Sequence, residues 1–156
     1  MGPCIREASV SASPETIWKR CIDNDFSWQE WDDDVIQVMS EGPLEQGTSI
    51  VFEMKPEMSI PKIPCILTKV VKNQLMEYKG SVGYGLIQLC GRIEITDGKS
   101  DGTTGSSSKV RYSFQMSGLL GTPLYWYSPK AVDHGTETGL ANIARLSEEA
   151  AGRGRT

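Results

Sequence analysis

The fold is decided by two stretches near the start of the chain, Val10-Ser-Ala-Ser-Pro-Glu-Thr-Ile-Trp-Lys19 and Phe26-Ser-Trp-Gln-Glu-Trp-Asp32. In the first, Ser13 suits the N-cap of a helix, Pro14 suits the first helical position, and Glu15 favours the positive end of the helix dipole. This pattern predicts a short helix to about residue 22, preceded by a strand at residues 5–10. The second stretch predicts a short helix or turn that ends in the acidic run 32–34.

From residue 35 onward the hydrophobic period changes from helical to two. The expected strands cover residues 35–41, 48–54, 65–71, 75–84, 86–95 and 109–116. In the last two, apolar and polar residues alternate cleanly, which is typical of an antiparallel sheet with one dry and one wet face. Residues 55–64 contain three prolines and are expected to form a loop, because proline cannot donate to a strand ladder.

A long helix is expected to close the chain, with a break near Pro129, because Thr122-Pro123 and Ser128-Pro129 both suit a helix start. Its inward face, at 100° per residue, is small and weakly apolar. That face comprises Thr136, Leu140, Ile143, Ala144 and Ser147.

The chain has 156 residues and a formal net charge of −4, with its basic residues scattered. It is long enough for one domain with a real core, spanning 1–156 and ordered from about 5 to 150. Residues 97–108 are expected to form a mobile loop and 151–156 a frayed tail. The charge argues against nucleic acid as a partner. The absence of an apolar run of roughly 20 residues, or of a signal-like start, favours a cytoplasmic protein without a transmembrane segment.

The motifs of cofactor-driven chemistry are missing from the sequence. The four cysteines form no C-x-x-C pair and are expected to be free thiols, and a single histidine, His134, makes a metal site improbable. No G-x-S-x-G elbow and no phosphate-cradling loop is present. We therefore expect neither a metal nor a cofactor, which leaves cofactor-free chemistry open.

The order of a strand, two short helices, six strands and a long helix resembles the START/polyketide-cyclase (SRPBCC) superfamily, the birch-pollen-allergen-like or helix-grip fold. The resemblance rests on the two opening stretches, on Gly42-Pro-Leu-Glu-Gln-Gly-Thr48, and on the final helix from Gly139 to Ala150. It implies an α+β fold in which a seven-stranded curved antiparallel sheet wraps around the long C-terminal helix. No catalytic motif is shared across this superfamily, so the resemblance carries over no catalytic residue.

The resemblance also implies a cavity between sheet and helix, and alternation along the strands selects its lining. The alternative is a filled core. Trp126, in the aromatic run 125–127, is expected at the entrance. The expected ligand-binding residues are Phe52, Met54, Ile66, Tyr84, Leu89, Phe114, Met116, Trp126, Thr136 and Leu140.

Three residues are candidates for catalysis. Tyr78 and Tyr112 fall on the inward face, where a phenol could polarise a substrate carbonyl or merely bond to a backbone oxygen. Asp133 lies near the inward side of the helix, where desolvation would raise its pKa and suit it to proton transfer. The alternative places Asp133 in water at the cavity mouth, together with Glu137, and His134 is expected on the surface.

Three functions follow from this pattern. The first is a cofactor-independent cyclase, dehydratase or isomerase that acts on a hydrophobic, polyketide-like intermediate. The second is a non-catalytic carrier or sensor of a lipid or other hydrophobic ligand. The third is a co-chaperone-like interaction module. The sequence favours the first narrowly and leaves the ligand and the oligomeric state open.

Overall fold

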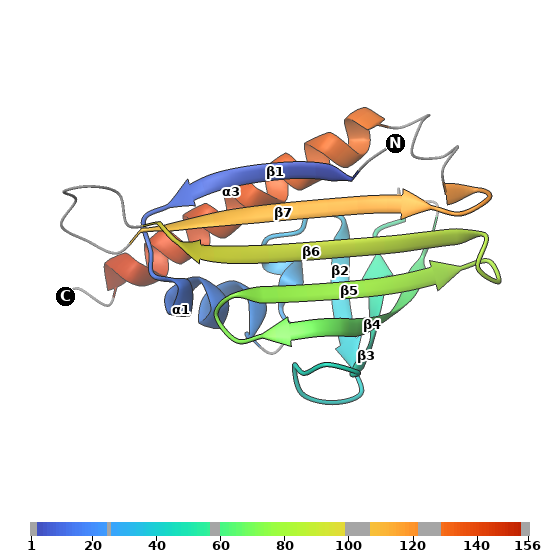
Figure 1. The fold of residues 1–156 in the computed structure, drawn as a ribbon, viewed down its shortest axis with the longest axis horizontal. Helices are drawn as coiled ribbons and strands as arrows, with labels where there is room; N and C mark the ends of the chain where they lie inside the picture. The colour runs from blue at the N-terminus through green and yellow to red at the C-terminus, as the bar shows by residue number, and fades with distance from the viewer. Residues whose placement is uncertain (1–2, 25, 57–59, 99–106, 122–128, 154–156) are drawn as a thin grey trace.

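The computed structural model describes residues 3–24, 26–56, 60–98, 107–121 and 129–153, and it shows one antiparallel sheet packed on one long helix (Figure 1). The sheet has seven strands in the order β1-β7-β6-β5-β4-β3-β2. The strands are β1 (Cys4–Val10), β2 (Val35–Ser40), β3 (Ser49–Met54), β4 (Lys62–Val71), β5 (Leu75–Val82), β6 (Ile87–Asp97) and β7 (Ser108–Ser117). This is the expected helix-grip arrangement.

The predicted helix start is confirmed at the first turn. Helix α1 (Pro14–Ile17) has Ser13 as its N-cap, whose hydroxyl accepts the backbone N–H of Thr16 at 3.2 Å. It continues into the π-helical η1 (Trp18–Ile22), and the 3₁₀ helix η2 (Trp28–Glu30) follows. The buried side chains of η1 face the core, so these turns cover one end of the sheet.

Helix α3 (Pro129–Arg153) crosses the sheet from the end of β7 towards α1, as Figure 1 shows. It begins at Pro129, one of the two predicted starts. The other start, residues 122–123, and most of the loop at 97–108 lie outside the described residues. The predicted inward face is confirmed, since Thr136, Leu140, Ile143 and Ser147 are buried and Ala144 packs against the core.

The alternation predicted for β6 and β7 is confirmed, with Ile87, Leu89, Ile93, Val110 and Tyr112 on the buried, inner face. The outer face carries polar and charged side chains in ion pairs, among them Glu7 with Lys109 at 3.0 Å. The core is therefore the layer between the inner face, α3 and the two short helical turns.

The structure corrects the expected loop at 55–64, because β4 already begins at Lys62 and includes Pro64. In the strand register, Pro64 pairs with Val51 of β3, whereas pairing of β4 with β5 starts only at Cys65. A proline is tolerated there because no ladder bond to β5 is required of it.

The inward phase predicted for β4 is also wrong at Ile66, although Val70, predicted to face inward as well, packs against the core. Cys65 and Leu67 are buried, whereas Ile66 is 51% exposed on the outer face. Residues 65–67 are all apolar, so alternation alone could not select the phase, and a register shift between Leu67 and Lys69 interrupts the period further along.

Candidate functional site

Two tyrosines from different strands meet at the middle of the inner face. Tyr78 of β5 pairs in the sheet with Gly91 of β6, and Tyr112 lies on β7 beyond it. A side chain at Gly91 would overlap the Tyr78 phenol, so this glycine leaves the space in which the ring lies across β6. The two hydroxyl oxygens are 3.3 Å apart.

Aromatic rings enclose the tyrosine pair. The ring centroid of Tyr78 lies 5.0 Å from that of Phe52 and 6.2 Å from that of Trp28. Trp31 meets Tyr112 edge-on at 6.2 Å. Each such contact contributes about 0.5–1.5 kcal/mol beyond its buried area. The two hydroxyls are therefore buried among aromatic rings.

One of the two hydroxyl hydrogens of the tyrosine pair has no acceptor among the described residues. Tyr78 and Tyr112 are 8% and 7% exposed, and each hydroxyl carries one hydrogen. Only one of the two can donate into the bond that joins them. Among the described residues no other group accepts from either hydroxyl, so the second hydrogen is available to an oxygen that enters the site.

Burial is the main cause that raises the pKa of Tyr78 and of Tyr112 above the usual value for a phenol, and the charge of Asp32 raises both further. The contact between the two hydroxyls raises the pKa of Tyr78, whereas the hydrogen bond with Tyr78 lowers that of Tyr112. Both phenols are therefore protonated at neutral pH and act as hydrogen-bond donors rather than bases.

Asp32 is the ionisable neighbour that the sequence analysis did not select. It follows Trp31 directly, and its side chain is half-buried. Desolvation raises its pKa to about 6, although its Oδ1 accepts the backbone N–H of Asp34 at 3.1 Å. Its position directly after Trp31 is the one feature of the sequence that could have indicated its partial burial.

The turn that carries Asp32 is held in place from two sides. The indole N–H groups of Trp28 and Trp31 donate to the backbone oxygens of Ile22 and Cys21, at 3.0 and 2.9 Å. From α3, the side-chain amide of Asn142 donates to the Trp31 carbonyl at 3.0 Å. Gly139 lies against the Trp31 ring, so part of the space left by the small helix face is filled by this turn.

Burial falls along β7 and towards the start of α3, while Ile87 and Leu89 of β6 stay buried. On β7, Val110 is fully buried and Tyr112 nearly so, whereas Phe114 and Met116 are half-buried. On α3, Ile143 is buried and Val132, towards the start of the helix, is half-buried. The tyrosine pair lies where the closed end gives way to the more open end.

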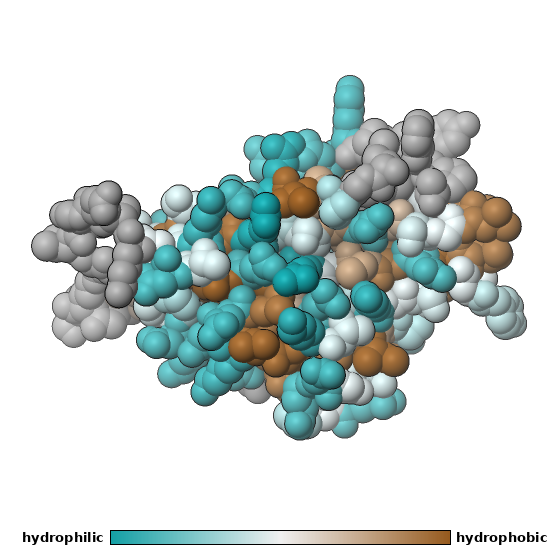
Figure 2. All heavy atoms as spheres, in the orientation of Figure 1, coloured by the Kyte–Doolittle hydropathy of each residue, from teal (hydrophilic) through white to brown (hydrophobic). Residues whose placement is uncertain are grey.

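Beyond the open end lies an apolar tip made by Tyr84, Leu86, Leu119 and Leu120. Figure 2 shows apolar side chains gathered at the β5–β6 turn and the end of β7. The backbone N–H of Leu120 donates to the oxygen of Leu86 at 2.9 Å, which joins the two segments. Leu119 is 77% exposed and Tyr84 fully so.

The structure brings several predicted ligand-binding residues to the inner face and excludes two. Phe52, Leu89, Thr136 and Leu140 are buried there, and Met54, Phe114 and Met116 are half-buried. The hydroxyl of Thr136 donates to the Val132 oxygen of its own helix at 2.7 Å. Trp126 lies outside the described residues.

Ile66 and Tyr84 are the two exclusions. Ile66 points to the outer face, and Tyr84 belongs to the β5–β6 turn rather than to a strand. Tyr84 has a φ of 57° between Gly83 and Gly85, both of which also have positive φ. Such a run of left-handed residues ends the strand at Val82 and turns the tyrosine into solvent.

Of the two alternatives for Asp133, the pKa raised by desolvation is wrong, and the exposed position agrees with the structure. Arg6 of β1 donates its Nε–H to Asp133 Oδ1 at 2.6 Å, and this hydrogen bond is the main cause of a lowered pKa for the carboxyl. The side chains of Asp133 and Arg6 are 41% and 46% exposed, and His134 and Glu137 are exposed as well. Asp133 lies against the edge strand, away from the tyrosines.

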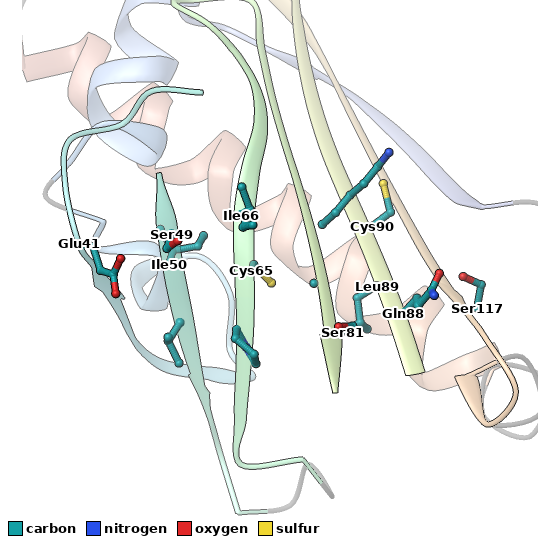
Figure 3. A pocket seen from close by; sticks show the side chains of 14 residues that line it. Glu41, Ser49, Ile50, Cys65, Ile66, Ser81, Gln88, Leu89, Cys90 and Ser117 are labelled. Atoms are coloured by element: carbon teal, nitrogen blue, oxygen red, sulfur yellow. The ribbon is translucent and has the colours of Figure 1, made fainter. Parts of the chain in front are cut away.

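A separate depression of about 760 Å³ lies over strands β3 to β7 (Figure 3). Many of its side chains belong to the outward set of their strands, including Ser49, Ile66, Ser81, Gln88 and Cys90. The tyrosine pair does not line it. We take the inner face as the candidate site because the paired, buried phenols lie there.

Metal ligands do not cluster in the described part of the chain, where no group of three or more His, Cys, Asp and Glu side chains could hold an ion. Its cysteines are all free thiols. None of the helices described there is long and apolar enough to span a bilayer.

No protein-family model and no curated protein matches this sequence. Solved structures do match. The di-domain ARO/CYC protein BexL of the BE-7585A biosynthetic pathway aligns over 95% of this chain with a TM-score of 0.68 and 14% identity. The di-domain ARO/CYC protein StfQ of the steffimycin pathway aligns over 96%, with a TM-score of 0.67 and 13% identity. The hypothetical protein jhp0584 from Helicobacter pylori aligns over 94%, with a TM-score of 0.70 and 13% identity.

The chain spans 47% of BexL and 52% of StfQ, about half of each di-domain protein, and 88% of jhp0584. At such identities the similarity concerns the fold alone. Together with the seven-stranded sheet, the short helices after β1 and the long α3, it shows that this protein has the helix-grip fold.

Proposed function

We propose that the protein binds a small, largely apolar molecule between the inner face of the sheet and α3, and that the tyrosine pair donates a hydrogen bond to an oxygen of that molecule. The observation that carries the proposal is the spare phenol hydrogen of Tyr78 and Tyr112 at the edge of the more open end. A few converging polar groups in an apolar lining are typical of small-molecule sites.

The proposal extends to chemistry on the bound molecule, as a cofactor-independent cyclase, dehydratase or isomerase of a polyketide-like compound. Two phenols held protonated could stabilise negative charge that develops on a carbonyl oxygen. The fold shared with the ARO/CYC proteins is consistent with this extension. A carrier that binds without reaction is the second candidate, favoured by the ion pair that ties Asp133 to Arg6.

The test compares two ligands of similar size, 2-acetonaphthone and 2-ethylnaphthalene, in which a CH₂ group replaces the carbonyl group. In the double variant Tyr78→Phe/Tyr112→Phe we expect the affinity for the ketone to fall roughly 3- to 10-fold, the value of one hydrogen bond. The affinity for the hydrocarbon should stay the same or rise. Titration calorimetry measures both affinities.

The control is Tyr84→Phe, since this tyrosine is fully exposed. It should leave both affinities unchanged. An equal loss for ketone and hydrocarbon would show that the pair makes no contact with the ligand oxygen. If neither ligand binds saturably to the wild-type protein, the inner face is a filled core and the proposal fails.

A further inference from the structure

We propose that strand β2 is an open edge of the sheet, at which the protein binds an extended, basic segment of a partner protein as an additional strand. The backbone groups on the open side of β2 bond to the partner segment, and the acidic residues at both ends of β2 contact its Lys or Arg side chains. Tyr78 and Tyr112 lie on β5 and β7, so binding at this edge does not depend on the candidate ligand site.

The two edges of the sheet differ in what covers them. At one edge β1 packs along α3, where Arg6 pairs with Asp133 and the N–H of Ser11 donates to Glu148 at 3.1 Å. At the other edge β2 bonds to β3 on one side. Among the described residues, no group bonds to the backbone on its other side. An uncovered strand edge is a template for a further strand.

The hydrogen bonds between β2 and β3 indicate which backbone groups face the open side. The N–H of Glu41 donates to the Ser49 oxygen at 3.1 Å. Because backbone groups point alternately to the two sides of an antiparallel strand, the N–H and C=O of Val38 and Ser40 point away from β3. The register shift of β2 lies before Val38. These open groups therefore belong to the regular part of the strand.

The side chains of β2 lack two features that usually protect an exposed edge from pairing, charges and proline. Its sequence is Val35-Ile-Gln-Val-Met-Ser40, whereas the covered strand β1 carries Arg6 and Glu7. Ile36 and Met39 are 44% and 39% exposed. A partner strand at this edge would therefore find both open backbone groups and apolar side chains.

The charge around β2 determines the chemistry of the partner. Nine of the 20 Asp and Glu of the chain, and none of its 16 Lys and Arg, lie between residues 21 and 54. Asp33 before β2 and Glu41 after it are exposed, and neither forms an ion pair among the described residues. Lys55 is the cation next to the first end, where its backbone N–H donates to the Asp34 oxygen at 2.9 Å. Charge complementarity therefore favours a segment with basic residues on both sides of an apolar stretch.

A second copy of this chain fits the edge less well. Antiparallel pairing of two β2 strands about a twofold axis would bring Asp33 of one copy towards Glu41 of the other. Like charges that face one another across strands are destabilising. A basic segment meets opposite charge at both ends instead.

The test measures binding of a fluorescein-labelled peptide, Lys-Arg-Ile-Thr-Val-Thr-Val-Arg-Lys, by fluorescence anisotropy. The control peptide has the same apolar core and glutamate at the four basic positions. The basic peptide should bind saturably, and its affinity should fall as salt is added. The acidic peptide should bind at least about 10-fold more weakly.

Two variants of Ser40 test the open edge itself. Ser40→Pro removes the N–H that points away from β3 and leaves the bonds to β3 in place. Ser40→Ala keeps this N–H and loses the same side-chain bonds to Gly42, so it is the matched control. Ser40→Pro should weaken binding of the basic peptide roughly 5- to 10-fold, the value of one hydrogen bond, whereas Ser40→Ala should bind it like wild type.

A charge reversal tests the acidic ends and does not depend on whether Ser40→Pro folds. Glu41→Lys should weaken binding of the basic peptide roughly 3- to 10-fold and strengthen binding of the acidic peptide. Asp97→Lys changes the net charge equally at an exposed residue at the end of β6, four strands from β2 in the sheet. It should leave both affinities nearly unchanged.

The inference is overturned if the basic peptide does not bind saturably, or if Glu41→Lys binds it as well as Asp97→Lys. Equal binding to folded Ser40→Pro and Ser40→Ala would also overturn it. A dimer in analytical ultracentrifugation that Ser40→Pro dissociates would assign the edge to a second copy and reject a basic partner. The naphthalene ligands test the tyrosine pair separately, so the proposed function and this inference can fail independently.

Discussion

Gly91 determines where the Tyr78 ring can lie. The ring crosses β6 at this residue, and any side chain there would overlap the phenol. The hydroxyl of Tyr78 then reaches Tyr112 on the next strand. One residue without a side chain therefore creates the hydrogen-bonded pair on which the candidate site depends.

Gly91→Ala should destabilise the protein by about 1–3 kcal/mol, because the added methyl group overpacks the core and displaces the Tyr78 ring. Urea denaturation measures the free energy of unfolding. Gly42→Ala is the control, since a methyl group there meets its nearest atom only at 3.9 Å and strains no turn. Equal effects of the two substitutions would contradict the account of Gly91.

At the scale of elements, the turn from Trp28 to Asp34 links the short helices, α3 and the tyrosine pair. Its indoles donate to the backbone of η1, and its Trp31 carbonyl accepts from Asn142 of α3. This packing fixes the backbone at Asp32, whose N–H donates to the Trp28 oxygen at 2.9 Å.

Asn142→Ala should lower the free energy of unfolding by about 1 kcal/mol, because the half-buried Trp31 carbonyl loses its donor. Arg145→Ala, three residues along the same helix, removes only an exposed pair with Glu149 and should change stability by less than about 0.5 kcal/mol. Thermal unfolding of both variants compares them. Asn142→Ala as mild as Arg145→Ala would show that this hydrogen bond does not hold the turn.

The sequence predicts elements well where one signal dominates. The Ser13-Pro14 helix start and the alternation along β6 and β7 are confirmed. The prediction of inward-facing residues fails at Ile66, because its neighbours in β4 are apolar too and alternation cannot select the phase. It also fails at Tyr84, which lies in a turn and not in the strand. Asp32 was not selected because its burial depends on contacts between residues far apart in the chain. Asp133 was selected because the sequence does not show that Arg6 on β1 pairs with it.

At the scale of the whole molecule, the sheet and α3 enclose a layer that is closed at one end and more open at the other. The buried residues Ile143 and Val110 belong to the closed end, and the half-buried Phe114 and Met116 lead towards the apolar tip. The tyrosine pair lies between these regions. A ligand that enters from the open end would therefore meet the phenols at the border of the closed end.

The central claim is that the tyrosine pair contacts a bound ligand, and NMR of protein labelled with ¹³C at tyrosine Cζ tests it most directly. The signals of Tyr78 and Tyr112, assigned by their loss in Tyr78→Phe and Tyr112→Phe, should shift saturably when 2-acetonaphthone is added. The signal of the exposed Tyr84 should not move. Saturable binding that leaves the signals of Tyr78 and Tyr112 unchanged would contradict the account.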